Sequence, residues 1–436
     1  MASFPEYRSG LFLAYFAVFF GGCGAAGSAD SASSLPSGGK PASAGAPGSG
    51  GRAAGGGTRS TAGGASSSEG GSAGVSAATP GSSGAADVAG AAGSEANASM
   101  PFVYVGSTNG QISIFSLEVE AGKLTLVKSV AAGNYPSFLA FDPTFEHLYA
   151  VNEPDGKLAS FAVDPKTADL TFLNRVDSGG AGPAFVSVDR SGKYVLVANY
   201  NAGTTRVSTI KSDGSLGAPS DDESPGKNSH MILTDPSNEF AFVINKGSDT
   251  ISQYAFDATD GTLTPNDVPV VMTPAGSGPR HLAFHPNGRY AYVIAETDDT
   301  LSAYAYDPEL GRLSFLESKS TLPAGEKGDA NTCAEVVVAP SGKFVYGSNR
   351  GHDSIARFSI DPDSGKLTFI DTTPSGGSVP RSFTLSADGE LMLVANESGN
   401  VTSFSVNTAS GALTKLLSLD VPQKPQFVGI ANLPSR

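Results

Sequence analysis

Short apolar runs separated by turn sequences recur along the chain from Met100 to the C-terminus. The runs are rich in Val, Phe and Tyr, and many are alternating or wholly apolar, whereas the breaks contain Asp-Pro, Asp-Gly or Ser-Gly. This pattern predicts β-strands joined by hairpin turns, because β-branched and aromatic side chains suit strands and Gly, Pro and Asp suit turns. No stretch in this region has a sustained helical period, so the pattern favours an all-β fold.

These runs belong to a repeat. Six segments align, and they end at positions 152, 199, 245, 295, 349 and 396, so the spacings are 47, 46, 50, 54 and 47 residues. A truncated seventh copy, FVYVGS, ends at Ser107. Each full unit contains four predicted strands, which at this period is typical of a β-propeller blade.

The two ends of the repeat region complement each other. Residues 102–107 lack the first strand of a unit, and residues 425–430 match a first strand with nothing after it. Pairing these segments would complete one blade from both termini and leave no open sheet edge. We therefore predict an all-β, seven-bladed β-propeller over residues 101–436, closed by its own termini and with no need to pair, so that a monomer is expected.

The first hundred residues have a different character. Leu11–Phe20 form an apolar run that is too short for a bilayer span of about twenty residues but suits a signal peptide. The following Gly21-Gly22-Cys23 resembles a bacterial lipoprotein cleavage site. We predict a signal peptide over residues 1–22 and lipidation of Cys23, with a plain secretory signal as the alternative.

Residues 24–100 predict a disordered linker, because 58 of these 77 residues are Gly, Ala or Ser. Such a segment has too little apolar surface to offset its chain entropy. The expected protein is exported and tethered to the bacterial cell envelope, on the outer membrane or the periplasmic face, and it contacts the membrane only through its lipid anchor.

Composition excludes several classes of function. The formal net charge is -14 and no basic run is present, which argues against nucleic acid as a partner. Two Cys and five scattered His leave little for a thiolate or all-His metal centre. We expect neither a metal nor a cofactor.

Polar residues gather at one predicted mouth of the propeller channel, where first strands start and second strands end. Three of the seven starts carry His230, Arg280 and Arg381, and several second-strand ends carry Asn beside a polar or charged residue. A cationic cluster on an acidic protein indicates a small anionic ligand. The candidates at the strand ends are Asn199, Tyr200, Glu296, Asn349 and Arg350, although repeated Asn residues also suit a role in the blade turns.

The segment GPRHLAFHPNG at 278–288, followed by Glu296, resembles the hallmark of the lactonase-type seven-bladed propeller family. This family includes propeller 6-phosphogluconolactonases and carboxy-cis,cis-muconate cyclases. Further similar segments are NYPSF at 134–138, ANY at 198–200, SNRGHDSI at 348–355 and PRSF at 380–383. The resemblance implies an active site made of His230, Arg280, Glu296 and Arg350. Lys246 departs from the family pattern, which usually has Asp-Leu-Gly in this blade.

The resemblance implies a metal-independent lactone hydrolase in which Glu296 or His230 takes a proton from water. Because phosphogluconolactone is cytosolic, an exported protein would act on a different carbohydrate-derived lactone. Asn199, Tyr200, Asn349 and Arg381 would bind the substrate. Three alternatives remain: a muconate cyclase-like enzyme, a non-enzymatic surface scaffold, and a calcium-dependent lactonase with Glu153, Asn199 and Glu296 as oxygen ligands.

Overall fold

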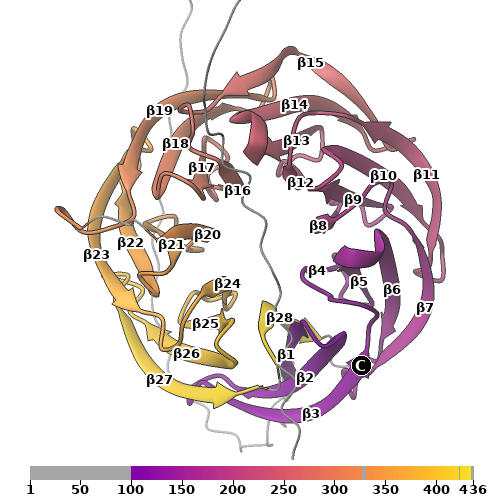
Figure 1. Cartoon of the computed structure of the whole chain (residues 1–436), viewed down its shortest axis with the longest axis horizontal. Coiled ribbons are helices and arrows are strands. Elements are labelled where there is room, and N and C mark those ends of the chain that lie inside the picture. Colours follow the sequence, from indigo (N-terminus) through magenta and orange to yellow (C-terminus); the bar gives the residue numbers. More distant parts are fainter. Residues whose placement is uncertain (1–99, 327–329, 422, 434–436) are drawn as a thin grey trace, which may run out of the picture. The chain divides into compact units, whose positions relative to one another are not determined.

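A computed structural model describes residues 100–326, 330–421 and 423–433 of the chain. These residues form seven four-stranded antiparallel sheets arranged as blades around a central axis (Figure 1). The predicted seven-bladed β-propeller is therefore confirmed. The predicted signal peptide, Cys23 and the linker lie outside the described residues.

Each blade runs from an inner first strand to an outer fourth strand. The first strands are β4 (Leu139–Phe141), β8 (Pro183–Val188), β12 (Ser229–Thr234), β16 (Pro279–Phe284), β20 (Thr332–Val338), β24 (Pro380–Leu385) and β28 (Pro425–Leu433). The second strands are β5 (His147–Asn152), β9 (Tyr194–Asn199), β13 (Phe240–Asn245), β17 (Tyr290–Ala295), β21 (Phe344–Arg350), β25 (Leu391–Asn396) and β1 (Met100–Ser107).

The two outer strands complete each blade. The third strands are β6 (Lys157–Val163), β10 (Thr204–Ile210), β14 (Thr250–Asp257), β18 (Thr300–Asp307), β22 (Ser354–Ile360), β26 (Asn400–Val406) and β2 (Gln111–Glu118). The fourth strands are β7 (Leu170–Asp177), β11 (Leu216–Glu223), β15 (Thr262–Met272), β19 (Arg312–Ser320), β23 (Leu367–Pro374), β27 (Leu413–Asp420) and β3 (Lys123–Ala131).

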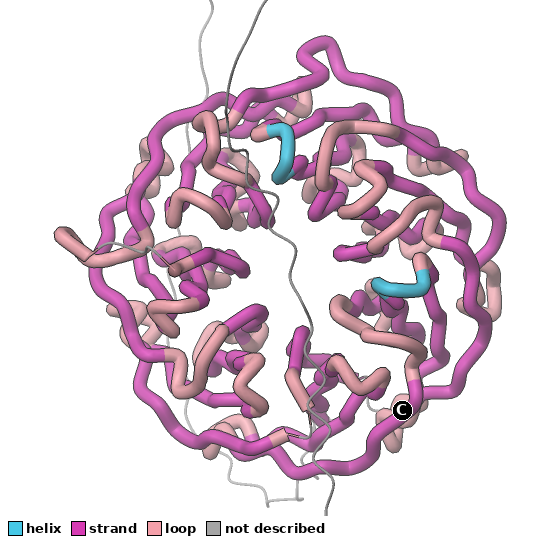
Figure 2. Tube along the Cα trace, viewed as in Figure 1, coloured by secondary structure: helices cyan, strands magenta, loops and turns pink. Residues whose placement is uncertain are grey.

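Helical structure in the described residues is limited to two single 3₁₀ turns, η1 (Glu153–Asp155) and η2 (Lys246–Ser248), which appear in cyan in Figure 2. Each turn follows directly after a second strand and so lies where the sequence predicts site residues. Within the described part of the chain, no helix is long and apolar enough to cross a membrane.

The ring closes as the sequence predicts. Strand β28 from the C-terminus pairs with β1 from the start of the propeller, with Phe102 opposite Ala431 and Tyr104 opposite Gly429. Figure 1 shows the two ends of the colour scale, indigo and yellow, side by side in this blade. The C-terminal segment therefore supplies the first strand of this blade, and the start of the propeller supplies the other three.

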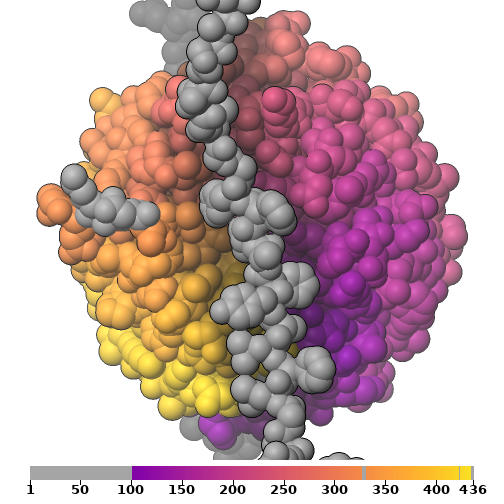
Figure 3. Space-filling view, viewed as in Figure 1, coloured from indigo at the N-terminus to yellow at the C-terminus, as the bar shows by residue number. Residues whose placement is uncertain are grey.

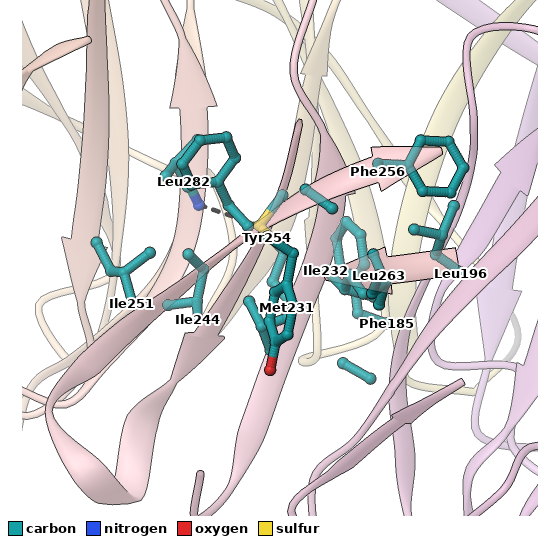
Figure 4. Packing of buried hydrophobic residues seen from close by; sticks show 14 of the residues in the cluster. Phe185, Leu196, Met231, Ile232, Ile244, Ile251, Tyr254, Phe256, Leu263 and Leu282 are labelled. Atoms are coloured by element: carbon teal, nitrogen blue, oxygen red, sulfur yellow. Dashed lines mark hydrogen bonds between the residues drawn. The ribbon is translucent and has the colours of Figure 1, made fainter. Parts of the chain in front are cut away.

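Apolar side chains pack between neighbouring blades. The space-filling view shows one face of the ring, on which neighbouring blades lie against one another (Figure 3). One cluster joins three consecutive blades, and Figure 4 shows Leu196, Met231, Phe256 and Leu282 within it. The middle strands read as almost continuous apolar runs because both of their faces are covered by adjacent sheets. This packing fixes the inner strands, which carry the site.

Buried tyrosines add a polar link between blades. The hydroxyl of Tyr149 donates to the Gly214 carbonyl at 3.1 Å, and Tyr346 donates to the Gly411 carbonyl at 2.8 Å. Tyr292 makes the same kind of bond to Gly365. A buried phenol needs a partner, and here the partner is a turn of the following blade, so these side chains hold adjacent blades in a fixed relation.

Candidate active site

The first strands present their site residues through β-bulges. The pairing of β12 with β13 skips a residue between Ser229 and Met231, so that His230 is unpaired. The same shift leaves Arg280 unpaired in β16 and Arg381 unpaired in β24. A bulge re-aims a side chain relative to the regular alternation of a strand. The repeat therefore supplies the same local geometry to three different side chains.

These side chains border one cavity of about 180 Å³. The residues that line it are Glu153, Ala184, Tyr200, His230, Lys246, Arg280, Glu296, Arg350 and Arg381. All four predicted catalytic residues are thus brought together, along with two of the predicted substrate-binding residues. The residues that line the cavity come from six different blades, so only the closed ring assembles the cavity.

Glu296 lies at the centre of a cluster of cations. Its Oε1 accepts a hydrogen bond from Lys246 Nζ at 2.6 Å and lies 3.2 Å from Arg350 Nη2. Its Oε2 lies 3.2 Å from Arg280 Nε. Burial opposes ionisation of this carboxyl group, but Arg280, Arg350 and Lys246 outweigh it and lower its pKa to about 2. Glu296 is therefore an anion at neutral pH.

Arg280 is almost fully buried, at 3% exposure. Its Nη1 donates to the Ala334 carbonyl at 2.6 Å, whereas its Nε faces Glu296 without the geometry of a hydrogen bond. Burial, followed by the nearby charges of Arg350 and Arg381, lowers the pKa of Arg280 to about 9. The guanidinium remains cationic at neutral pH, with part of its hydrogen-bonding capacity unused.

Arg350 is anchored by the backbone of the neighbouring strand. Its Nη2 donates to the Cys333 carbonyl at 2.9 Å and also contacts Glu296. Arg381 is held from another side, where its Nη1 lies 3.5 Å from Glu397 Oε1. The cavity therefore contains fixed positive charge without a matching number of free carboxylates.

His230 differs from the cations around it because its imidazole is neutral. Burial, followed by the charge of Arg280, lowers its pKa well below the usual 6.5. Its Nδ1 is buried and has no hydrogen-bond partner among the described residues, and the ring packs edge-on against Tyr200 and His281. An unsatisfied buried polar group in a native structure needs an explanation, and a catalytic role is one of the possible explanations. His230 is thus a neutral imidazole beside the cations.

His281 lies in the layer behind the cavity, between blades. Its Nδ1 lies 2.8 Å from Glu335 Oε1, and its Nε2 lies 3.4 Å from Arg280 Nη1. The ring also packs edge-on against Phe138 and Phe185. His281 therefore contacts Arg280 and His230 from the side away from the cavity.

Two predicted substrate-binding residues do not line the cavity. Asn199 donates from Nδ2 to the Ser178 carbonyl, and Asn349 accepts from Thr321 and donates to its carbonyl. Both amides are fully buried, and these partners lie in the connections that lead into their blades. The structure thus places both side chains at the turns of the blades, and it does not support their predicted contact with the substrate.

Three residues outside the predicted set also line the cavity, namely Glu153, Ala184 and Lys246. Lys246 and Glu153 both follow second strands, at the register positions of the predicted residues Tyr200 and Arg350. The strand-end register is therefore the sequence signal that points to both. In the sequence, Lys246 stands out only as a departure from the family pattern, and Glu153 only as a candidate calcium ligand.

The proposed calcium ligands do not form a calcium site. The Asn199 amide is bonded to the Ser178 carbonyl, and Glu296 is surrounded by Lys246, Arg280 and Arg350, which would repel a metal cation. Among the residues that the structure describes, no group of three or more His, Cys, Asp or Glu side chains is placed to hold a metal ion. The donor set therefore favours an anionic rather than a cationic ligand.

Comparisons with known proteins identify the family of the chain. Residues 102–428 match the family described as "Lactonase, 7-bladed beta-propeller". The chain is 33% identical to the 6-phosphogluconolactonase of Bacillus subtilis over 333 residues, which cover 72% of this chain and 94% of that protein. It is 31% identical to the 6-phosphogluconolactonase of Formosa agariphila over 327 residues, 70% of this chain and 91% of that protein.

A solved structure extends the comparison. The periplasmic gluconolactonase of Pseudomonas aeruginosa is 27% identical and superimposes with a TM-score of 0.71, over 77% of this chain and all of that one. The family match spans nearly the whole described propeller. The chain therefore belongs to the seven-bladed β-propeller lactonases, a family of carboxylic ester hydrolases.

Proposed function

We propose that this protein hydrolyses a carbohydrate-derived lactone without a metal ion. The observation that carries the proposal is a neutral, buried imidazole, His230, which borders the same small cavity as Arg280 and Arg350. Hydrolysis of a lactone needs a base for water and positive charge where the oxyanion develops. The cavity supplies both.

The residues divide the chemistry between them. His230 takes one proton from a water molecule as the water oxygen bonds to the carbonyl carbon. Arg280 and Arg350 stabilise the negative charge on the carbonyl oxygen. The bond between the carbonyl carbon and the ring oxygen then breaks, and the ring oxygen takes the proton from His230. The product is an open-chain hydroxy acid, whose carboxylic acid releases its proton to solvent.

Glu296 serves this mechanism as the anion that positions the cations. With a pKa of about 2, it is a weak base and has no proton to donate at neutral pH. A cyclase mechanism in which Glu296 protonates an alkene carbon is therefore disfavoured. A purely structural propeller would also not need four cationic side chains, each from a different blade, in one cavity.

The substrate we propose is an exported or periplasmic sugar lactone. The Leu11–Phe20 run with Cys23 predicts export, which separates the protein from cytosolic phosphogluconolactone. The similarity to a periplasmic gluconolactonase supports the same substrate class. The relatives named 6-phosphogluconolactonase support the reaction rather than this exact substrate.

The test is a pH-drop assay on the full chain with a panel of sugar and aliphatic lactones, with and without EDTA, beside His230→Gln. We expect hydrolysis that EDTA does not affect and a fall of about 10²–10⁴-fold in His230→Gln, the usual range for a general base. EDTA-sensitive hydrolysis would contradict the metal-free mechanism. Full activity in His230→Gln would remove the proposed base, and no hydrolysis of any lactone would refute the function.

A further inference from the structure

The cavity has an imbalance between donors and acceptors. Lys246, Arg280, Arg350 and Arg381 can only donate hydrogen bonds. Glu296, the central acceptor, is already occupied by three of these cations. The cations therefore face a ligand that offers acceptor oxygens.

Glu153 is the exception on the cavity wall. Its Oε2 is buried and receives no hydrogen bond from the residues that the structure describes. By contrast, Asp155 in the same 3₁₀ turn accepts a hydrogen bond from Asn134 Nδ2 at 3.1 Å. A buried carboxylate oxygen without a donor is costly, so a donor supplied by a bound ligand would stabilise Glu153.

The backbone fixes Glu153 in this position. It is the first residue of η1, it is followed by Pro154, and its N–H donates to the Tyr135 carbonyl at 3.4 Å. Its blade, β4–β7, lies across the ring from blade β20–β23, which carries Arg350 (Figure 1). Glu153 and Arg350 therefore approach a ligand from opposite sides.

An unsubstituted lactone would satisfy only one of these sides. Its carbonyl and ring oxygens are acceptors, so they complement the cations but give Glu153 nothing. An ammonium substituent would be repelled by the four cations, and a phosphate or carboxylate at this position would be repelled by Glu153. Hydroxyl groups are the neutral donors that fit.

We propose that Glu153 is the specificity-determining residue that selects hydroxylated lactones, by accepting hydrogen bonds from ring hydroxyls while the carbonyl faces His230 and the cations. This inference rests on the proposed function, because it assigns an orientation to that substrate. It makes Glu153 a binding residue without a part in proton transfer.

The experiment compares glucono-δ-lactone with δ-valerolactone, which has the same ring without hydroxyl groups. Hydrolysis of both is measured with the full chain, with Glu153→Gln and with the control Asp155→Asn, which removes a carboxylate from the same turn outside the cavity. We expect Glu153→Gln to lower kcat/KM for the hydroxylated lactone about ten-fold or more, as for the loss of a hydrogen bond to a charged group. Hydrolysis of δ-valerolactone should fall much less, and this remaining hydrolysis also shows that the variant is folded, whereas the control should match the unaltered chain on both lactones.

Binding of the hydrolysis-resistant analogues glucono-δ-lactam and δ-valerolactam, measured by calorimetry, separates recognition from turnover. If lactones are not hydrolysed but the preference for the hydroxylated lactam is lost in Glu153→Gln, the proposed function fails and the subsite stands. If lactones are hydrolysed and the variant lowers both ligands equally, or keeps the preference, the assignment of Glu153 is overturned and the proposed function stands.

Discussion

At Glu296, two opposing effects act on one carboxyl group. Burial alone would raise its pKa, whereas three cations within 3.2 Å stabilise its charge. The charges prevail, and the result decides the chemistry, because an ionised carboxylate with a pKa of about 2 cannot act as a general acid at neutral pH. The sequence names the residues in this balance but not their distances, so it leaves the choice between Glu296 and His230 open.

The pH dependence of kcat/KM tests this assignment. A base acts in its unprotonated form, and the pKa of His230 lies well below 6.5. We therefore expect activity to be constant from neutral pH down into the acid range and to fall only below pH 6.5. Glu296→Gln leaves the cations uncompensated, which lowers the pKa of His230 further and should move this acid limb to still lower pH.

The same variant should lose about 10²-fold in kcat, comparable to the loss of one oxyanion donor, because the cations are no longer positioned. A pH titration of both proteins on one lactone provides the measurement. If the acid limb disappears in Glu296→Gln, then Glu296 is the titrating base and the assignment to His230 is wrong.

At the scale of single elements, the β-bulge explains which site residues the sequence could predict. Reading the repeat in register identified His230, Arg280 and Arg381 because each occupies the bulge position of its first strand. Second-strand ends are less informative. Asn199 and Tyr200 are neighbours there, but the Asn199 amide is bonded to the Ser178 carbonyl, whereas the Tyr200 side chain lines the cavity. That difference depends on the turn geometry, which the repeat pattern does not contain.

Strands β16 and β20 also share a polar contact that should be structural. His281 on β16 lies 2.8 Å from Glu335 on β20, and both are buried. We expect Glu335→Leu to lower the free energy of unfolding by about 1–3 kcal/mol, because the buried imidazole loses its partner. Urea denaturation measures the change, with Glu309→Leu in an exposed turn as the control. Equal stability of the two variants would show that the contact contributes nothing.

At the scale of the whole propeller, the site depends on ring closure. The cavity takes residues from six blades, so a ring that opens at one junction would separate side chains that are far apart in sequence. The sequence predicted this closure correctly because both ends of the repeat are incomplete in complementary ways. At the junction, a side-chain carbon on Gly106 would lie 2.3 Å from the Pro136 carbonyl oxygen, so the closing blade can approach its neighbour only with glycine there.

Ending the chain at Lys424 removes β28 and tests whether closure stabilises the fold. Val428 and Leu433 are fully buried, and losing them removes roughly 3–6 kcal/mol of burial, comparable with the total stability of an ordinary domain. The deletion also exposes β1 as an unpaired edge, which favours aggregation. We expect no cooperative thermal transition and aggregates on size-exclusion chromatography. A chain ending at Leu433 keeps every described pair of β28 and should melt like the full chain; an unchanged melting temperature in the shorter chain would show that the ring is stable without its closing strand.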